Sequence, residues 1–231
     1  MKLITGIFIL LTVAFFISCK DEEGEILTPI DYNYFPIEYG NWIVYDVDST
    51  VHLTIDDLTN QPDTSIAYYH YQIRETIDSS FIDGEGDVAF RIRRESRMND
   101  TLPWEFLNIW TCKRNYNSAQ KVEDNIRFVK LSFPVSTRSL WNGNAYNNYP
   151  SENYSFDQIH QRLTIGSFSF DSTVTVNQFE RISLIDRIIR KEKYAFTVGL
   201  VSKQRDSLNI NILGQITNGV EFFQSINSYG K

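Results

Sequence analysis

The sequence predicts a mainly β protein built on a strongly curved antiparallel sheet, a half-barrel or open barrel, with a two-sheet β-sandwich as the alternative. Short stretches of two-residue apolar alternation recur between turn residues, and no long segment keeps a helical period. Hydrophobic residues make up 42% of the chain, which is enough for a sizeable core. Because helices to cover the sheet are scarce, its apolar face must be buried by curling or by a second sheet.

The expected strands follow one another along the chain. After a turn at Gly40, Trp42 and Val44 alternate with Ile43 and Tyr45, so both faces of the first strand are expected to contact other side chains. Further strands are expected at residues 68–77, 88–97, 104–114, 126–133, 154–165, 168–179, 187–194, 200–203, 208–213 and 219–228.

The clearest hairpin is the segment QRLTIGSFSFDSTVTV, with its turn at Gly166. One face of its second strand carries Phe168, Phe170, Val174 and Val176, and the other carries Ser167, Ser169, Asp171, Thr173 and Thr175. This alternation predicts one buried face and one solvent-exposed face.

Residues 1–18 have the pattern of a secretory signal peptide. Lys2 gives a positive start, and the apolar run from Leu3 to Ile17 is too short to cross a hydrocarbon core of about 30 Å comfortably. Ser18-Cys19 follows this run and resembles the lipobox of bacterial lipoproteins. Cys19 is therefore expected to become the lipidated first residue of the mature chain. A non-lipidated signal peptide and a buried N-terminal helix are the alternatives.

The chain after the signal divides into a tether and a domain. Residues 19–30 are expected to be the lipidated cysteine and an acidic tether, and residues 31–231 a single β-rich domain. Acyl chains on Cys19 anchor a protein to a membrane, since each buried methylene contributes roughly 0.8 kcal/mol. The segment Lys20-Asp21-Glu22-Glu23 resembles the signal that sends Bacteroidota-type lipoproteins to the cell surface. We expect an outer-membrane location on the cell surface, with the periplasmic leaflet as the alternative.

Charge and cysteine content exclude several classes of partner and site. Without residues 1–18 the chain has 21 basic and 29 acidic residues, a net charge of −8, which argues against nucleic acid or an anionic membrane surface as partners. With Cys19 acylated, Cys112 has no disulfide partner. Cys112 is expected to be a small buried residue on a strand, with a reactive thiol as the alternative.

Four segments resemble a family of uncharacterised Bacteroidota outer-membrane lipoproteins. They are FPIEYGNWIVYDVDS, RFVKLSFPVSTRSLWNGNAYN, EKYAFTVGLVSKQ and VEFFQSINSYG. They are similar to a "YFP…G..W.Y" opening, a "WNGN" turn and a "YA..VGLV" segment in that family, and the resemblance implies fold and location only. The "YA..VGLV" segment also resembles one in periplasmic lipoprotein carriers, where a curved sheet wraps an apolar cavity. Here Phe196-Thr197 stands where the carriers have Pro-Gly.

No catalytic, metal or cofactor site is expected. His52, His70 and His160 have no paired spacing, and the chain lacks a nucleophile elbow, a P-loop and a dinucleotide fingerprint. Asp83-Gly84-Glu85-Gly86-Asp87 places carboxylates on alternate residues, but Val88 and Arg94 stand where an EF-hand needs glycine and glutamate. A hairpin turn is the expected structure there, with a weak calcium site as the alternative.

Tryptophan residues next to asparagines could belong either to the core or to a sugar-binding site. Trp104, Phe106, Trp110 and Cys112 are expected to share a strand face with Asn108. Trp141 lies beside Asn142, Gly143 and Asn144 in an expected loop. Either set can be core packing and turn chemistry, the favoured interpretation, or a platform that stacks on a sugar.

Two functions therefore stay open. The first is a non-enzymatic, membrane-anchored lipoprotein that binds an apolar ligand or a protein partner at the cell envelope. The second is a glycan-binding accessory lipoprotein of an outer-membrane uptake system. An apolar cavity favours the first, and an exposed row of tryptophans favours the second. Short Asp-Ser/Thr segments, such as those at Asp100-Thr101 and Asp171-Ser172, also resemble the O-glycosylation acceptors of exported Bacteroidota proteins.

Overall fold

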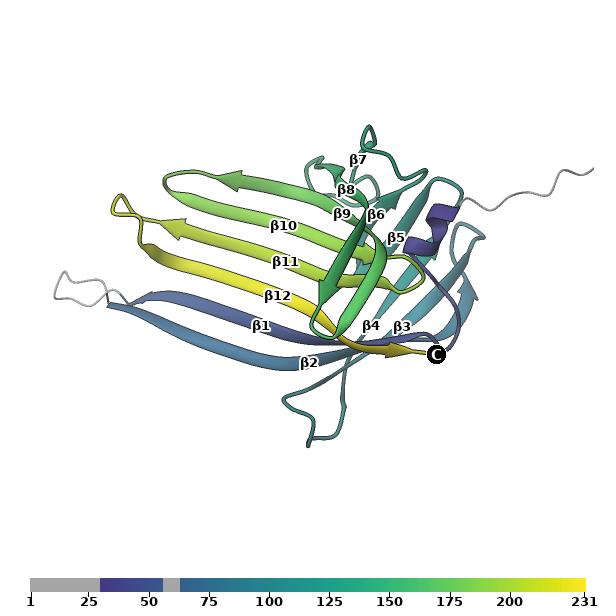
Figure 1. Ribbon diagram of the computed structural model, residues 1–231, viewed down its shortest axis with the longest axis horizontal. Helices are drawn as coiled ribbons and strands as arrows, with labels where there is room; N and C mark the ends of the chain where they lie inside the picture. Colours follow the sequence, from purple (N-terminus) through teal and green to yellow (C-terminus); the bar gives the residue numbers. More distant parts are fainter. Residues whose placement is uncertain (1–29, 56–62) are drawn as a thin grey trace, which may run out of the picture.

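The computed structural model describes residues 30–55 and 63–231, and these form one antiparallel sheet of twelve strands (Figure 1). A short 3-10 helix, η1 (Ile30–Tyr34), precedes the strands. The strands are β1 (Trp42–Ile55), β2 (Asp63–Ile82), β3 (Val88–Arg97), β4 (Glu105–Arg114), β5 (Ser118–Glu123), β6 (Ile126–Ser132), β7 (Leu140–Asn142), β8 (Asn153–Ile165), β9 (Phe168–Ile182), β10 (Asp186–Ala195), β11 (Gly199–Ile210) and β12 (Ile216–Gly230). The predicted curved sheet is confirmed, and the two-sheet sandwich is wrong because all twelve strands share one sheet.

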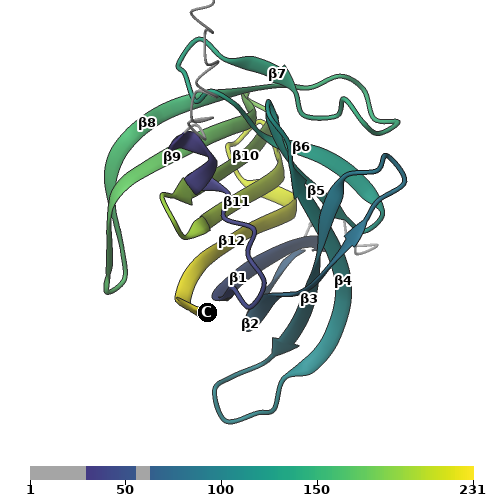
Figure 2. The same ribbon diagram turned by 90° about the vertical axis from the view of Figure 1, so that its right-hand side faces the viewer.

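The sheet closes through the two ends of the chain. Its order is β6-β5-β4-β3-β2-β1-β12-β11-β10-β9-β8-β7, so strands adjacent in sequence pair with each other, except β6 and β7 at the two edges, and β12 pairs with β1. The sheet curls into a nearly closed barrel with an unsealed seam between β6 and β7 (Figure 2). Isolated hydrogen bonds bridge this seam: the Val129 amide donates to the Gly143 carbonyl (2.9 Å), and Trp141 Nε1 donates to the Val129 carbonyl (3.0 Å).

One end of the barrel is filled by η1 and the residues after it (Figure 2). Tyr32, Tyr34 and Phe35 are buried in the main core cluster. Arg114 of β4 donates from one terminal nitrogen to the carbonyls of Tyr32 (2.7 Å) and Phe35 (3.0 Å), which fixes this segment in the barrel. Among the described residues, no helix has the length and apolar character needed to cross a membrane.

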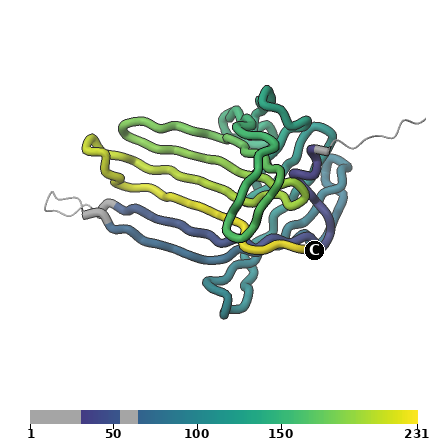
Figure 3. Tube along the Cα trace, in the orientation of Figure 1, coloured from purple at the N-terminus to yellow at the C-terminus, as the bar shows by residue number. Residues whose placement is uncertain are grey.

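The opposite end of the barrel carries the turns of the long hairpins. The turns between β9 and β10 and between β11 and β12 lie away from η1 and from the C-terminus (Figure 3). Both turns expose aliphatic side chains, with Leu184 89% and Ile212 96% exposed. The two ends of the barrel therefore differ, one filled by aromatic side chains and the other bearing exposed aliphatic turns.

The strand pattern explains most of the predicted elements. Residues 88–97 form β3 with the predicted bounds, and Gly166, with φ of 56°, makes the turn between β8 and β9. Val44 and Tyr45 of β1 are both buried, so both faces of this strand are covered as expected.

Three predictions about the strands are wrong. β11 is one strand, because β10 and β12 pair with it through the polar residues 204–207 that interrupt its apolar pattern. β5 and β7 were not predicted, since β5 is mostly polar and β7 has three residues. The predicted solvent face of β9 is buried at Thr173 and Thr175, where the Thr173 hydroxyl donates to the Gln161 carbonyl of β8 (2.8 Å).

Candidate ligand chamber and its charge layer

Seven charged side chains cross the barrel interior, and we call them the charge layer. They are Glu75 of β2, Arg94 of β3, Lys121 and Glu123 of β5, Lys130 of β6, Glu192 of β10 and Lys203 of β11, and no side chain among them is more than 15% exposed. Strand alternation places them, since inward positions are two residues apart along each strand. On β5, Lys121 and Glu123 share the inward face with buried Ala119.

Ion pairs connect the layer from one side of the barrel to the other. Lys130 Nζ lies 2.8 Å from a Glu123 carboxylate oxygen and 2.9 Å from one of Glu192. Lys203 approaches the same two carboxylates at 3.3 and 3.5 Å. The Tyr194 hydroxyl donates to the other Glu192 oxygen (2.6 Å). Each of these carboxylates therefore has more than one polar partner.

A second group of the layer centres on Glu75. Lys121 Nζ donates to one Glu75 oxygen (2.8 Å), and Arg94 Nε donates to the other (3.0 Å). The Arg94 guanidinium also stacks on the Trp110 ring at 3.4 Å from its centroid. Glu75 therefore keeps a cationic partner if either one of its two partners is removed.

The environment of the layer keeps its carboxylates ionised. Burial by itself raises the pKa of Glu75, Glu123 and Glu192, but the nearby ammonium and guanidinium groups outweigh burial and leave each pKa below its ordinary value. Burial lowers the pKa of Lys130, and the attraction of Glu123 and Glu192 reverses this, so its pKa is raised. The layer therefore holds four cationic and three anionic groups.

These pKa shifts predict loss of stability in acid. A carboxylate whose pKa is lowered by folding stabilises the fold above its unfolded pKa, and that contribution disappears as the pH falls through its folded pKa. We expect the free energy of unfolding, measured by urea titration, to fall steadily below about pH 4.5, the ordinary glutamate value. Replacing Glu75 with glutamine should flatten part of this dependence. An unfolding free energy that stays constant from neutral pH to about pH 3 contradicts the prediction.

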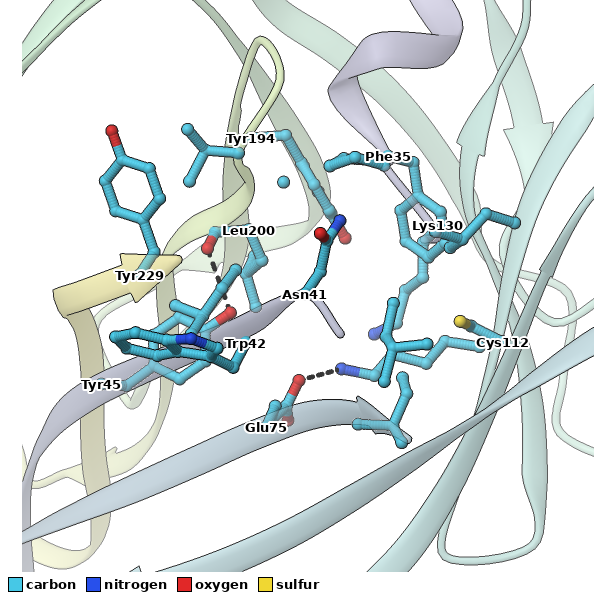
Figure 4. A pocket seen from close by; sticks show the side chains of 18 of the residues that line it. Phe35, Asn41, Trp42, Tyr45, Glu75, Cys112, Lys130, Tyr194, Leu200 and Tyr229 are labelled. Atoms are coloured by element: carbon cyan, nitrogen blue, oxygen red, sulfur yellow. Dashed lines mark hydrogen bonds and ion pairs between the residues drawn. The ribbon is translucent and has the colours of Figure 1, made fainter. Parts of the chain in front are cut away.

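An apolar chamber of about 320 Å³ lies between η1 and the charge layer (Figure 4). Its walls are mainly apolar and come from the segment after η1, five strands and the turn between β10 and β11: Phe35, Pro36, Ile37, Ile43, Ile77, Ile92, Cys112, Val198 and Leu200. Its floor is part of the layer: Glu75, Lys121, Glu123, Lys130 and Glu192. Half-buried Asn41 also lines it, and the exposed residues Thr197 and Lys231 lie at its rim. We call this cavity the chamber.

A second hollow of about 850 Å³ lies on the other side of the charge layer. Arg94 and Lys203 line this hollow and not the chamber, and Glu123 lines both. Its remaining lining mixes aromatic side chains such as Trp110 with polar ones such as Arg205. The layer therefore divides the barrel interior into a mainly apolar chamber and a more polar hollow.

Cys112 is a buried wall residue of the chamber. It is 3% exposed, and burial raises the pKa of its thiol to about 12. A thiol with this pKa is protonated at neutral pH and therefore a poor nucleophile. The expectation of a small buried residue on a strand is confirmed.

The three histidines lie apart from one another and from the chamber. His52 Nε2 is 2.9 Å from a Glu221 carboxylate oxygen. His70 Nδ1 is 2.8 Å from a carboxylate oxygen of Asp48, and His160 Nδ1 is 2.7 Å from the Tyr34 hydroxyl. Each ring thus takes part in a separate local contact.

The acidic segment forms the turn between β2 and β3. The carboxylates of Asp83, Glu85 and Asp87 converge, with ligand atoms within 4.8 Å of one another. Lys113 of β4 lies among them, with Nζ 2.7 Å from Asp83 and 2.9 Å from Asp87, and it also pairs with Glu85. The hairpin turn is confirmed, and the three carboxylates share one ammonium group, while Glu85 also pairs with Arg127.

The predicted face of β4 is confirmed for Asn108, Trp110 and Cys112, which point into the barrel, and wrong for Trp104 and for Phe106, which is exposed. Trp110 points into the barrel, where its Nε1 donates to Asp124 (3.1 Å). Trp104 precedes β4 and lies on the outer face, with the guanidinium groups of Arg74 and Arg97 at 4.7 and 4.3 Å from its ring centroid. An irregularity in the pairing of β3 with β4 separates the two faces.

Trp141 packs against the core. Its ring centroid is 4.8 Å from that of Phe156 and 6.1 Å from that of Tyr154. It lies in β7, where a loop was predicted. Gly143, two residues later, lies directly over the Tyr154 ring, because an added Cβ would be 2.2 Å from it.

The Asp-Ser/Thr segments differ in accessibility. Thr101 is exposed in the connection between β3 and β4. The Ser172 hydroxyl instead contacts the Tyr34 hydroxyl at 2.6 Å inside the barrel. Of these two, Thr101 is the one that a modifying enzyme can reach in the folded chain.

Comparison with protein-family models, with curated proteins and with solved structures finds no match for this chain. The functional argument therefore depends on the chamber and its charge layer. The sequence contained one signal of this layer that was missed: Lys121 and Glu123 are charged residues two apart, in a segment between strands that were predicted. Cys19 and residues 1–29 lie outside the described residues.

Proposed function

We propose that the protein is a non-enzymatic lipoprotein of the cell envelope, held on the outer membrane through Cys19, that binds an apolar ligand in the chamber. The observation that supports this proposal is the chamber itself, a cavity of about 320 Å³ with mainly apolar walls and polar groups gathered at one end. Small-molecule sites in proteins are cavities of this kind and of about 300–1,000 Å³.

The position of the chamber agrees with exchange of a ligand with the surroundings. Its rim includes Thr197, which is exposed, and Lys231, whose side chain is 64% exposed and pairs with Glu38. Apolar walls such as Ile77 and Ile92 favour an apolar group over water, at about 25 cal/mol for each Å² of apolar surface removed from water.

The tryptophans favour an apolar ligand over a glycan. A sugar-stacking platform needs exposed, neighbouring aromatic faces. Trp110 lies beneath Arg94, Trp104 beneath Arg74 and Arg97, and Trp141 packs on the core. The remaining tryptophan, Trp42, is half-buried. Trp42 and Trp104 line the same hollow on the outer face of the sheet, but the Trp104 ring already stacks with two guanidinium groups.

The lipid anchor has a direct test. Replacing Cys19 with serine removes the thiol that accepts the acyl chains, so we expect the protein to leave the membrane fraction and to lose metabolic acyl labelling. Replacing Cys112, which is buried in the barrel, with alanine is the matched control and should leave both unchanged. Continued acyl labelling of the Cys19→Ser variant contradicts the proposed anchor.

The ligand site is tested with residues 20–231, which contain every described residue. We expect the neutral fluorophore N-phenyl-1-naphthylamine to bind with enhanced fluorescence. Val198→Trp, which adds a large side chain to the chamber wall, should weaken binding at least tenfold. Val88→Trp, at an exposed position, is the matched control. Equal affinity of both variants, or turnover of a hydrolase substrate that one histidine or carboxylate substitution abolishes, contradicts the proposal.

A further inference from the structure

The charge layer as a whole carries more positive than negative charge, although its chamber side holds two of the cations, Lys121 and Lys130, beside the three carboxylates. Arg94, Lys121, Lys130 and Lys203 face three carboxylates, those of Glu75, Glu123 and Glu192, which leaves one positive charge in excess. The rim does not alter this balance, since Glu38 and Lys231 pair with each other at 2.7 Å. An uncompensated charge inside a protein is costly, and a counter-ion relieves that cost.

The donors that remain on this floor face the chamber. Lys121 and Lys130 line the chamber, whereas Arg94 and Lys203 line the hollow on the other side. An ammonium group has three donor hydrogens. Within the described residues Lys121 Nζ has one hydrogen bond, to Glu75, and lies 4.8 Å from the centroid of the Trp110 ring, and Lys130 Nζ pairs with Glu123 and Glu192. Both ammonium groups therefore keep donor capacity at the chamber floor.

The carboxylates of the floor have less capacity left to accept hydrogen bonds from a ligand. Glu75 already pairs with Lys121 and Arg94, and Glu192 accepts from Lys130 and from the Tyr194 hydroxyl. A cationic head group in the chamber would meet carboxylates that already have cationic or hydroxyl partners. An anionic head group would meet free donors and cancel the excess charge.

We infer that the ligand of the chamber is an amphipathic anion, such as an alkyl carboxylate, whose apolar part contacts the chamber walls and whose head group binds Lys121 and Lys130. This inference rests on the proposed function, because it assigns a chemical class to the ligand of that same site. The apolar walls at Ile77, Ile92 and Leu200 match the alkyl part, and the two ammonium groups match the head.

The test compares three ligands with the same alkyl chain in residues 20–231. Decanoate, decanol and decylammonium are titrated against bound N-phenyl-1-naphthylamine at neutral pH. We expect decanoate to displace the fluorophore at a concentration at least tenfold lower than decylammonium and several-fold lower than decanol. This order is measured in the unsubstituted protein, so it does not depend on the folding of any variant.

Lys121→Met identifies the head-group site. The variant is expected to fold, because Arg94 still pairs with Glu75 at 3.0 Å, and circular dichroism and a cooperative thermal transition check this. Its preference for decanoate over decanol should disappear while fluorophore binding is kept. Lys191→Met removes the same charge from a lysine that pairs with Glu180 and does not line the chamber, and it should keep the preference.

The outcomes separate this inference from the proposed function. If the fluorophore does not bind, or none of the three ligands displaces it, the proposed function is wrong. If the fluorophore binds and decanol or decylammonium displaces it as well as decanoate does, the apolar site stands and the anionic ligand is overturned. Retention of the decanoate preference in a folded Lys121→Met variant also overturns the assigned head-group site.

Discussion

Replacing Lys130 with methionine is expected to destabilise the fold by about 3–5 kcal/mol, because removal of one partner leaves buried charges uncompensated. Its ammonium lies between Glu123 and Glu192 at 2.8 and 2.9 Å, and the Glu192 side chain is 1% exposed. Lys203 alone then faces both carboxylates, at the longer distances of 3.3 and 3.5 Å. The measurement is the free energy of unfolding from urea titration at neutral pH.

A double variant distinguishes lost charge balance from lost packing. Lys130→Met combined with Glu192→Gln removes one charge of each sign, and we expect it to be more stable than Lys130→Met alone. Lys191→Met, at a partly exposed position, should change the free energy of unfolding by less than about 0.5 kcal/mol. If Lys130→Met lowers the free energy of unfolding by less than about 1 kcal/mol, this lysine does not stabilise the charge layer as described.

Replacing Gly219 with alanine is expected to cost about 2–4 kcal/mol. Gly219 of β12 has φ of 127°, and an added Cβ would lie 2.1 Å from the Ser207 carbonyl oxygen of β11. The clash is with backbone, so a side-chain rotation cannot relieve it. The affected pair of strands adjoins β1, where the two ends of the chain are joined in the sheet.

Gly166→Ala is the matched control for this substitution. Gly166 also has a positive φ, 56°, but an added Cβ there meets no atom within 4 Å. Its cost should be limited to the left-handed backbone, about 1–2 kcal/mol. Thermal and urea unfolding of both variants measure the difference. Equal losses in the two variants would show that the close approach of β11 to β12 does not constrain residue 219.

The strands were predictable where local alternation and turn residues agree. Residues 88–97 follow a glycine-rich turn and match β3, and Gly166 marks the turn of its hairpin because its φ is positive. The polar residues 204–207 interrupted the pattern, and the two flanking strands hold them in β11 regardless. Sequence patterns predict a strand poorly when its hydrogen-bonding partners lie far away in the chain.

The chamber was not predictable from the same signals. Closure of the barrel depends on pairing of β1 with β12, for example Val47 with Gln224, across most of the chain. The charge layer draws its members from β2, β3, β5, β6, β10 and β11, and only the closed barrel brings Glu75 near Lys121 or Lys130 near Glu192. A charged residue on a strand is normally assigned to solvent, and that assignment fails where opposite charges meet inside a barrel.

Photolabelling with a neutral alkyl diazirine tests the central claim most directly, because it reports where an apolar ligand lies. After irradiation of residues 20–231, peptide mass spectrometry locates the labelled residues. We expect labels on the chamber walls, at residues such as Ile77, Ile92 and Leu200, and their loss in Val198→Trp. Labels confined to the exposed aliphatic turns at Leu184 and Ile212, unchanged in Val198→Trp, would contradict a ligand site in the chamber.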